Sequence, residues 1–282
     1  MVLYIMGAGR SGSTVLGVTL GNCDGLFYAG ELDAWLSRSG SPQLEDEPRM
    51  RFWRGVREQV PGAGALFGRS AERSLERSLS LFRVNLWGER RRLRAPYRTI
   101  AESLYRAVSV AAGAPVIIDS SHYPLRAREL QDVVGIDLHL LFLIRDPRSV
   151  AASFSNTDVA QYTKSTLTTN VYLWLTHLLA VWVFLRQPRA RRMVVRYEDF
   201  AADPQRVVGD ILRAAHIESA PPDFSSLRTG LAFQGNRLLH SETIALKGPG
   251  GSPAGRSALT ALLQAPLQAL LNRLEPVAAE GP

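Results

Sequence analysis

The sequence predicts an α/β fold in which a central, mainly parallel sheet is flanked by helices on both faces. Short apolar runs that fit buried strands alternate along the chain with segments of helical periodicity. A glycine-rich loop directly follows the first apolar run and opens a helical segment, as in a strand–loop–helix unit. With 282 residues, 46% of them apolar, the chain is long enough for such a fold with helical insertions. We therefore expect residues 1–282 to form one domain.

Five apolar runs have the length and composition of buried strands. In chain order they cover residues 2–6, 26–28, 115–119, 138–144 and 193–195. Polar residues suited to a site stand at or just after the ends of these runs, namely Arg10, Glu31, residues 119–122, Arg145 and Tyr197. Ligands bind beyond the carboxyl ends of the strands in such sheets, so we expect these residues to converge on one site.

Helical spacing predicts most of the connecting segments in the first half of the chain. The first helix follows the glycine-rich loop and has Leu16 and Leu20 one turn apart. A short helix is expected near residues 50–60, in an otherwise irregular stretch. An amphipathic helix is then expected from the spacing of Leu75, Leu79, Phe82 and Leu86. We interpret the arginines of this segment, residues 69–94, as a solvated face, and expect a separate helix over residues 99–112.

Capping residues and composition predict the helices of the second half. Asp146 can cap a helix that starts at Pro147. The largely apolar residues 167–186 predict a long buried helix, and residues 217–255 are rich in Gly, Pro and Ser and predict a loop. Further helices are expected over residues 125–133, over residues 204–215 and after the capping residue Ser257.

Composition and charge narrow the possible functions. The formal charge of +7, from 33 basic and 26 acidic residues, favours an anionic ligand, and no motif for nucleic acid accompanies it. Cys23 is the only cysteine, which excludes an intrachain disulfide and a cysteine-based metal cluster, and the histidines have no metal-ligand spacing. Met1 leads straight into the first strand without a signal peptide, and the apolar run 171–185 is too short to span a bilayer. We expect a cytoplasmic protein without a metal or a transmembrane segment.

Residues 7–14, Gly-Ala-Gly-Arg-Ser-Gly-Ser-Thr, have the layout of a phosphate-binding loop. They fit the pattern G-x-x-x-x-G-K-[ST] at every fixed position except one, because Ser13 stands where the lysine is expected. Arg10 supplies a cation inside the loop instead. The loop amides and the following helix N-terminus predict an anion site. Without the lysine that reaches the β- and γ-phosphates, the loop is poorly suited to ATP hydrolysis.

A second anion site is predicted where the fourth strand ends. Arg145 stands just before the helix expected to start at Pro147, and Ser149 and Ser153 then lie one turn apart on one face of that helix. An arginine, a hydroxyl and a helix end together can bind a phosphate. Taken with the glycine-rich loop, this site implies a ligand that carries two separated anionic groups.

Together these segments resemble the sulfotransferases that use 3′-phosphoadenosine 5′-phosphosulfate (PAPS). Residues 7–14 resemble their 5′-phosphosulfate loop, and residues 143–153 resemble their 3′-phosphate motif. Residues 196–204 resemble a third segment, whose tyrosine lies near the adenine. The third strand ends in Asp-Ser-Ser-His at residues 119–122, where bacterial members have Asp-Ser-Ser-Lys. The C-terminal Lys-Gly loop of the family is matched only in part, by residues 245–249.

The resemblance implies a P-loop-like three-layer fold and transfer of a sulfuryl group from PAPS to an acceptor hydroxyl or amine. It implies 3′,5′-adenosine bisphosphate as the other product, a small-molecule or carbohydrate acceptor, and no metal. The acceptor site would be shaped by the insertions at about 35–95 and 155–190. The residues implied to bind PAPS are Gly9, Arg10, Ser11, Gly12, Ser13, Thr14, Arg145, Ser153, Tyr197 and Lys247.

Two residues are candidates for the base that deprotonates the acceptor, and Arg10 is the cation expected nearest the transferred group. Glu31 follows the second strand, and its distance from Arg10 matches the arginine-to-glutamate separation in protein-tyrosine sulfotransferases. His122 stands at the end of the third strand, where cytosolic sulfotransferases carry a catalytic histidine, and imidazole suits base chemistry at neutral pH. His122 also occupies the position of the lysine in bacterial relatives, so it could instead bind the sulfuryl group as a cation.

Two other functions are compatible with parts of the sequence. One is a P-loop kinase or NTPase that uses ATP and Mg²⁺, with Asp119 as the metal ligand, although Ser13 argues against it. The other is a non-catalytic module that binds polyanions through the arginines of residues 69–94.

Overall fold

The computed structural model describes residues 1–155, 165–246 and 258–274. Its centre is a sheet of five strands, which are β1 (Val2–Gly7), β2 (Leu26–Gly30), β3 (Val116–His122), β4 (Leu138–Ile144) and β5 (Arg192–Arg196). The order across the sheet is β2-β3-β1-β4-β5, and every pairing is parallel. All five carboxyl ends therefore meet at one edge, and the predicted α/β class is confirmed.

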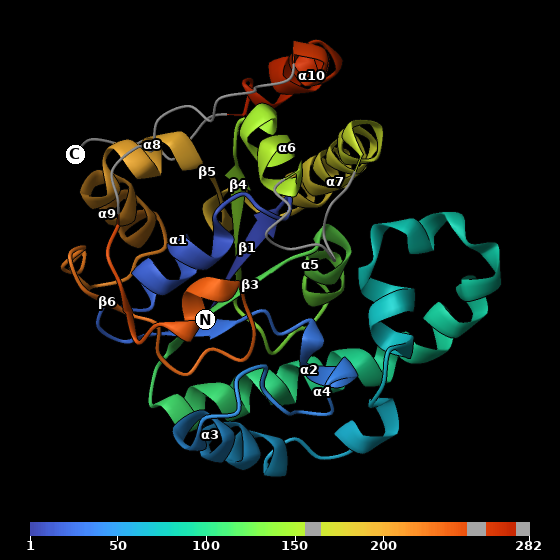
Figure 1. Ribbon diagram of the computed structural model, residues 1–282. Coiled ribbons are helices and arrows are strands. Elements are labelled where there is room, and N and C mark those ends of the chain that lie inside the picture. The colour runs from blue at the N-terminus through green and yellow to red at the C-terminus, as the bar shows by residue number, and fades with distance from the viewer. Residues whose placement is uncertain (156–164, 247–257, 275–282) are drawn as a thin grey trace.

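Helices cover both faces because side chains alternate along each buried strand (Figure 1). Leu3 and Ile5 of β1 pack with α1 (Ser13–Leu20), α8 (Tyr197–Ala202) and α9 (Pro204–Ala214). Tyr4 and Met6 face the other layer. That layer contains α2 (Ala34–Ser37), α3 (Glu47–Glu58), α4 (Trp87–Ala112), α5 (Pro124–Leu130), α7 (Thr166–Arg186) and α10 (Ala258–Leu271). The helix α6 (Pro147–Ser155) packs against α7, and the short strands β6 (Leu227–Arg228) and β7 (Thr243–Ile244) pair separately.

The segment before α4 differs from the amphipathic helix that its apolar spacing predicts. It forms a π-helical turn, η2 (Glu72–Glu76), and two 3₁₀ turns, η3 (Ser78–Phe82) and η4 (Val84–Leu86). Leu79 and Phe82 are 58% and 69% exposed, whereas Glu76 and Ser80 are buried. Polar partners determine this arrangement: Glu76 accepts hydrogen bonds from Arg126 and Tyr97, and Ser80 Oγ accepts one from Arg90. The helical interpretation of this segment was wrong because these hydrogen bonds outweigh the apolar periodicity.

The helix expected over residues 99–112 is the second half of α4, which continues through Pro96. Proline removes one backbone hydrogen bond from a helix interior. Pro96 and Arg92, whose carbonyl loses its partner, are both exposed, so water can satisfy that carbonyl. The predicted break between two helices is therefore absent.

Two further expectations need correction. The predicted loop over residues 217–255 contains β6, β7 and the 3₁₀ turn η7 (Arg237–His240) within its described part. The apolar run that seemed too short to span a bilayer belongs to α7, whose 21 residues are long and apolar enough to do so. Because α7 packs against α5, α6, α10 and the strands β1 and β4, its apolar composition also suits a core helix.

A buried ionic network ties the insertion to the sheet. Arg126 on α5 is 3% exposed. One of its nitrogens, Nη1, donates to Glu76 Oε1 and to Tyr97 Oη, both at 2.7 Å. The other, Nη2, lies 3.3 Å from Asp119 Oδ2 and from Tyr105 Oη. One guanidinium and two phenols bind an oxygen of each carboxylate and offset much of the cost of burying them, while Glu76 Oε2 has no hydrogen-bond partner among the described residues.

Replacing Arg126 with leucine should therefore destabilise the folded protein. The substitution leaves two buried carboxylates without their cation, and we expect the free energy of unfolding to fall by about 3–5 kcal/mol in chemical denaturation. The control is Arg106→Leu, which removes an ion pair to Glu102 from a side chain that is 70% exposed. That change should cost less than about 1 kcal/mol. Similar losses in the two variants would contradict a special role for the buried network.

Candidate active site

The glycine-rich loop lies between β1 and α1, and two of its residues adopt a left-handed backbone conformation. Arg10 and Gly12 have φ angles of 68° and 94°, in the left-handed region. A Cβ on Gly12 would lie 2.3 Å from the Tyr197 ring, so only glycine allows the ring to approach so closely. Gly12 precedes α1, and no side chain caps this helix end within the described chain. The amides of the first turn of α1 can therefore bind an anion.

The hydroxyls of the loop are shielded from solvent. Ser11, Ser13 and Thr14 are all buried. The Ser11 hydroxyl oxygen has no hydrogen-bond partner among the described residues. A buried hydroxyl without a partner is costly, and a bound phosphate or sulfate oxygen would satisfy it. This observation fits the loop residues to an anionic ligand.

The loop after β4 meets the glycine-rich loop, as predicted for the second anion site. Arg145 Nη1 donates to the Arg10 carbonyl oxygen at 3.0 Å. The Arg145 guanidinium also lies 4.4 Å from the centre of the Tyr197 ring. The carbonyl of Asp146 accepts the amides of residues 149 and 150, so α6 starts at Pro147 as expected. Three strand ends, those of β1, β4 and β5, therefore meet at one place.

Of the remaining residues considered for the 3′-phosphate site, the structure describes Ser149 and Ser153 but not Lys247. Ser149 and Ser153 lie one turn apart on α6, with Ser149 buried and Ser153 half-buried. This is the predicted arrangement of the two hydroxyls. Lys247 lies outside the described residues, so its role stays a prediction.

Glu31 lies at the end of β2 in a largely buried position. Its amide donates to the Gln234 carbonyl at 2.8 Å, and Gln234 Nε2 lies 3.4 Å from Glu31 Oε2. Burial raises the pKa of Glu31 from its usual 4.5 to about 7. The bond from Gln234 opposes this rise in pKa, the charge of Asp119 adds to it, and the charges of Arg77 and Arg10 oppose it. Glu31 can therefore gain and lose a proton near neutral pH.

His122 ends β3 next to the glycine-rich loop. It pairs in register with Met6 and has a φ angle of 55°, which turns the chain out of the strand. Its Nε2 lies 3.8 Å from the position that a Cβ would take on Gly9. The ring also packs on Tyr123, with the centroids 4.2 Å apart. Both candidate bases thus lie at the edge of the sheet that carries the loop.

Asp119 organises this edge from a fully buried position. Its Oδ1 accepts the Ser121 amide at 2.8 Å and the Leu32 amide at 3.5 Å, and it also accepts the Ser121 hydroxyl. Its Oδ2 is bound by Tyr105 and Arg126. Both carboxylate oxygens are therefore occupied by protein donors. No cluster of three potential metal-binding side chains is found in the described part of the chain.

Arg77 is a site residue that the sequence did not reveal. It lies between η2 and η3, where we expected a solvated helix face. Its guanidinium lies 4.1 Å from the centre of the Tyr123 ring, forms an ion pair with Glu72 and lies 3.8 Å from Asp33. Its charge lowers the pKa of Glu31, so it acts electrostatically on the candidate base. Nothing in the local sequence distinguishes Arg77 from its neighbouring arginines.

Tyr172 of α7 is a second residue that was missed. The Gly9 amide donates to its hydroxyl at 2.7 Å, so Tyr172 binds the backbone of the glycine-rich loop. Its ring packs edge-on against Phe154 of α6. Burial raises the pKa of Tyr172, which keeps the phenol neutral. The residue was hidden in the sequence because it lies within a long apolar helix.

Comparisons with known proteins agree with this geometry. The model of a family described as the sulfotransferase family matches residues 3–221. The sulfotransferase domain from the curacin biosynthetic pathway is 16% identical, with a TM-score of 0.54, over 94% of this chain and 96% of that one. The sulfotransferase domain of the Synechococcus PCC 7002 olefin synthase is 20% identical, with a TM-score of 0.55, over 95% and 94%. At these identities the structures show a shared fold. A search of curated protein sequences found no match.

The raised pKa of Glu31 predicts an unusual pH dependence of stability. Because the folded pKa of Glu31 exceeds the unfolded one, the contribution of Glu31 to stability is greatest below pH 4.5 and is lost as the pH rises through 7. Glu31→Gln removes this cost, so the variant should be more stable than the wild type by roughly 2–3 kcal/mol at pH 8. Denaturation at several pH values should show the difference narrowing towards pH 4.5. A difference independent of pH would contradict the raised pKa.

Proposed function

The chain belongs to the sulfotransferase family, and on that basis we propose that it transfers the sulfuryl group of PAPS to an acceptor hydroxyl or amine. We propose that the acceptor is a small molecule or a carbohydrate. One observation carries the choice of donor: Arg145 donates to the Arg10 carbonyl, which brings the second anion site against the glycine-rich loop. A nucleotide with a 5′ and a 3′ anionic group could then contact both sites at once.

The described residues suggest how PAPS would be held. The amides at the start of α1, with the buried hydroxyls of Ser11, Ser13 and Thr14, would bind the 5′-phosphosulfate. Arg145 and Ser153 would bind the 3′-phosphate. Other proposed contacts are Gly9 and Gly12 through the loop backbone, Tyr197 beside the adenine, and Lys247.

The proposed reaction is an in-line transfer that needs no metal. The acceptor oxygen or nitrogen attacks sulfur while the bond from sulfur to the 5′-phosphate oxygen breaks, which releases 3′,5′-adenosine bisphosphate. Glu31 takes the acceptor proton, and its pKa of about 7 lets it do so at neutral pH. Arg10 and the N-terminus of α1 stabilise the negative charge that develops on the leaving phosphate. His122 contributes a cation to the transferred group or, in the alternative assignment, acts as the base.

Arg77 adds a role that the sequence did not predict. Its charge favours the ionised carboxylate of Glu31. The Arg77 side chain is also 37% exposed, so part of it can be reached from solvent. We propose that Arg77 belongs to the acceptor side of the site, within the 35–95 insertion.

The geometry favours this function over the two alternatives. A kinase would need a magnesium ligand, but both oxygens of Asp119 are bound by protein groups. A continuous polyanion-binding helix over residues 69–94 is not formed, because only residues 87–94 belong to α4, and Arg94 of this segment is bound to Glu129. Our proposal also keeps residues 1–282 as one domain in the cytoplasm, with the insertion at 155–190 contributing to the acceptor site.

Calorimetry with 3′,5′-adenosine bisphosphate tests the nucleotide assignment. The wild type should bind, and Arg145→Ala should bind about ten- to a hundredfold more weakly because a charged hydrogen bond is lost. Arg51→Ala is the control, since it removes the same charge from a side chain that is 76% exposed. Binding that is absent in the wild type, or equal in both variants, would refute the two-site nucleotide model. A screen of acceptors with labelled PAPS then identifies the substrate.

Turnover measurements test the base. For the wild type, kcat/KM should rise about tenfold per pH unit below pH 7 and level off above it, because Glu31 must be ionised. Glu31→Gln should lower kcat by roughly a hundred- to ten-thousandfold and leave the binding of 3′,5′-adenosine bisphosphate unchanged. If this variant keeps its turnover while His122→Ala loses it, the base is His122.

A further inference from the structure

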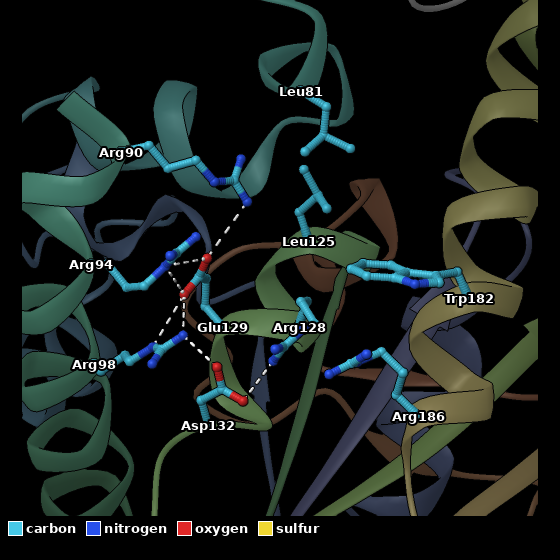
Figure 2. Close-up of a pocket in the computed structure, with 10 residues that line it drawn as sticks. All are labelled: Leu81, Arg90, Arg94, Arg98, Leu125, Arg128, Glu129, Asp132, Trp182 and Arg186. Atoms are coloured by element: carbon cyan, nitrogen blue, oxygen red, sulfur yellow. Dashed lines mark hydrogen bonds and ion pairs between the residues drawn. The ribbon is translucent and has the colours of Figure 1, made fainter. Parts of the chain in front are cut away.

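A cavity of about 340 Å³ lies away from the glycine-rich loop, between η3, α4, α5 and α7 (Figure 2). Five arginines line it: Arg90, Arg94 and Arg98 from α4, Arg128 from α5 and Arg186 from α7. None of the residues assigned to PAPS lines this cavity, and neither do Glu31, His122 or Arg77, although Leu81 and Trp182 belong to the two insertions that we assign to the acceptor site. The arginines of the cavity therefore have no role in the transfer proposed above and need a separate explanation.

Only two carboxylates offset these charges. Glu129 is 1% exposed, and Arg94 Nε and Arg98 Nη2 donate to its Oε2 at 3.0 and 2.8 Å. Arg90 Nη2 lies 3.5 Å from Glu129 Oε1. Asp132 is bound by Arg98 at 2.6 Å and by Arg128 at 2.7 Å. Five guanidinium groups against two carboxylates leave an excess of three positive charges around one cavity.

Arg186 is the arginine that these carboxylates do not neutralise. Its guanidinium lies 5.6 Å from the centre of the Trp182 ring, and no carboxylate pairs with it among residues 1–155, 165–246 and 258–274. Figure 2 shows Arg128 and Arg186 extending into the same cavity from α5 and α7. Guanidinium groups that share a cavity repel each other unless an anion lies between them.

The neighbouring positive charges also affect the pKa of Arg90. Burial lowers the pKa of Arg90, and the charge of Arg94 lowers it further, while Glu129 raises it. The cations of α4 therefore act on one another despite the shared carboxylate. An additional anion in the cavity would relieve this repulsion.

Three apolar side chains also line the cavity. They are Leu81 of η3, Leu125 of α5 and the indole of Trp182, which is 46% exposed and lies beside Arg186 on α7. A large aromatic side chain with one face in solvent is suited to packing against a ligand. The lining of the cavity therefore combines cationic and apolar side chains.

We propose that this cavity binds a phosphate monoester whose organic part is apolar. A phosphate monoester is close to a dianion at neutral pH and matches the planar fork of arginine. The phosphate would lie between Arg128 and Arg186, and the apolar part would contact Trp182 and Leu81. The cavity volume lies within the range of small-molecule sites. Soluble organic phosphates and lipid headgroups share this chemistry.

Calorimetry with 1-naphthyl phosphate tests the proposal. The titration is carried out on the full chain with the donor site saturated by 3′,5′-adenosine bisphosphate, so that binding at the glycine-rich loop does not contribute. The wild type should bind this ester more tightly than inorganic phosphate, which lacks the apolar part. Arg186→Ala should weaken binding of the ester by about ten- to a hundredfold, and Arg186→Lys by less.

Arg91→Ala is the matched control. Arg91 lies on α4 beside the cluster, is exposed and does not line the cavity, so its loss changes the net charge equally. It should leave the affinity for 1-naphthyl phosphate unchanged. Neither Arg186→Ala nor Arg91→Ala should change the affinity for 3′,5′-adenosine bisphosphate. If that nucleotide does not bind at all, the proposed donor fails, and the comparison of variants with 1-naphthyl phosphate still tests this cavity.

Vesicles distinguish the two sources of the ligand. Binding of 1-naphthyl phosphate that depends on Arg186 supports a soluble ester. Binding that depends on Arg186 but occurs only on vesicles with phosphatidic acid, and not with phosphatidylcholine alone, supports a lipid headgroup. Equal affinity in the wild type and Arg186→Ala, equal losses in Arg186→Ala and Arg91→Ala, or no binding of either probe would overturn the proposal.

Discussion

The buried pairing of Arg126 with Glu76 and Asp119 is the constraint on which the rest of the structure depends. It joins η2 and α5 to β3 inside the fold, where an unpaired charge would cost several kcal/mol. Asp119 in turn holds the Leu32 and Ser121 amides at the ends of β2 and β3. The positions of the two candidate bases are therefore set by a network that touches neither of them, and the insertion cannot move without disturbing that edge.

Much of the fold could be predicted because its determinants are local. Apolar runs identify the strands, and the glycine spacing identifies the loop between β1 and α1. The helix predicted over residues 72–86 was wrong because burial there is decided by partners that lie far away in the sequence. Glu76 is buried by Arg126, while Leu79 and Phe82 remain in solvent, which reverses the expectation from side-chain polarity. The continuity of α4 through Pro96 likewise depends on the solvent exposure of the helix, which the sequence does not report.

The candidate site shows the same division. The proximity of Arg10 and Arg145 could be predicted from the sequence because parallel strands place their carboxyl ends at one edge of the sheet. In the structure a hydrogen bond joins the two residues. Arg77 and Tyr172 could not, because they enter from an insertion and from a helix whose packing is decided by tertiary contacts. A single sequence identifies the groups that the sheet topology presents, and it misses those that approach from outside the sheet.

The hydrogen bond from the Gly9 amide to Tyr172 adds a polar link between the glycine-rich loop and α7, which also pack together through Ala8 and Leu173. In the proposed function the loop belongs to the donor side, whereas α7 belongs to the segment that we assign to the acceptor side. A shift of α7 that accommodates a different acceptor must move the Tyr172 hydroxyl, and it then either moves Gly9 as well or leaves a half-buried amide without its partner. Divergence towards new acceptors through this helix is therefore constrained by the proposed nucleotide site, and we expect it to be freer in the 35–95 insertion.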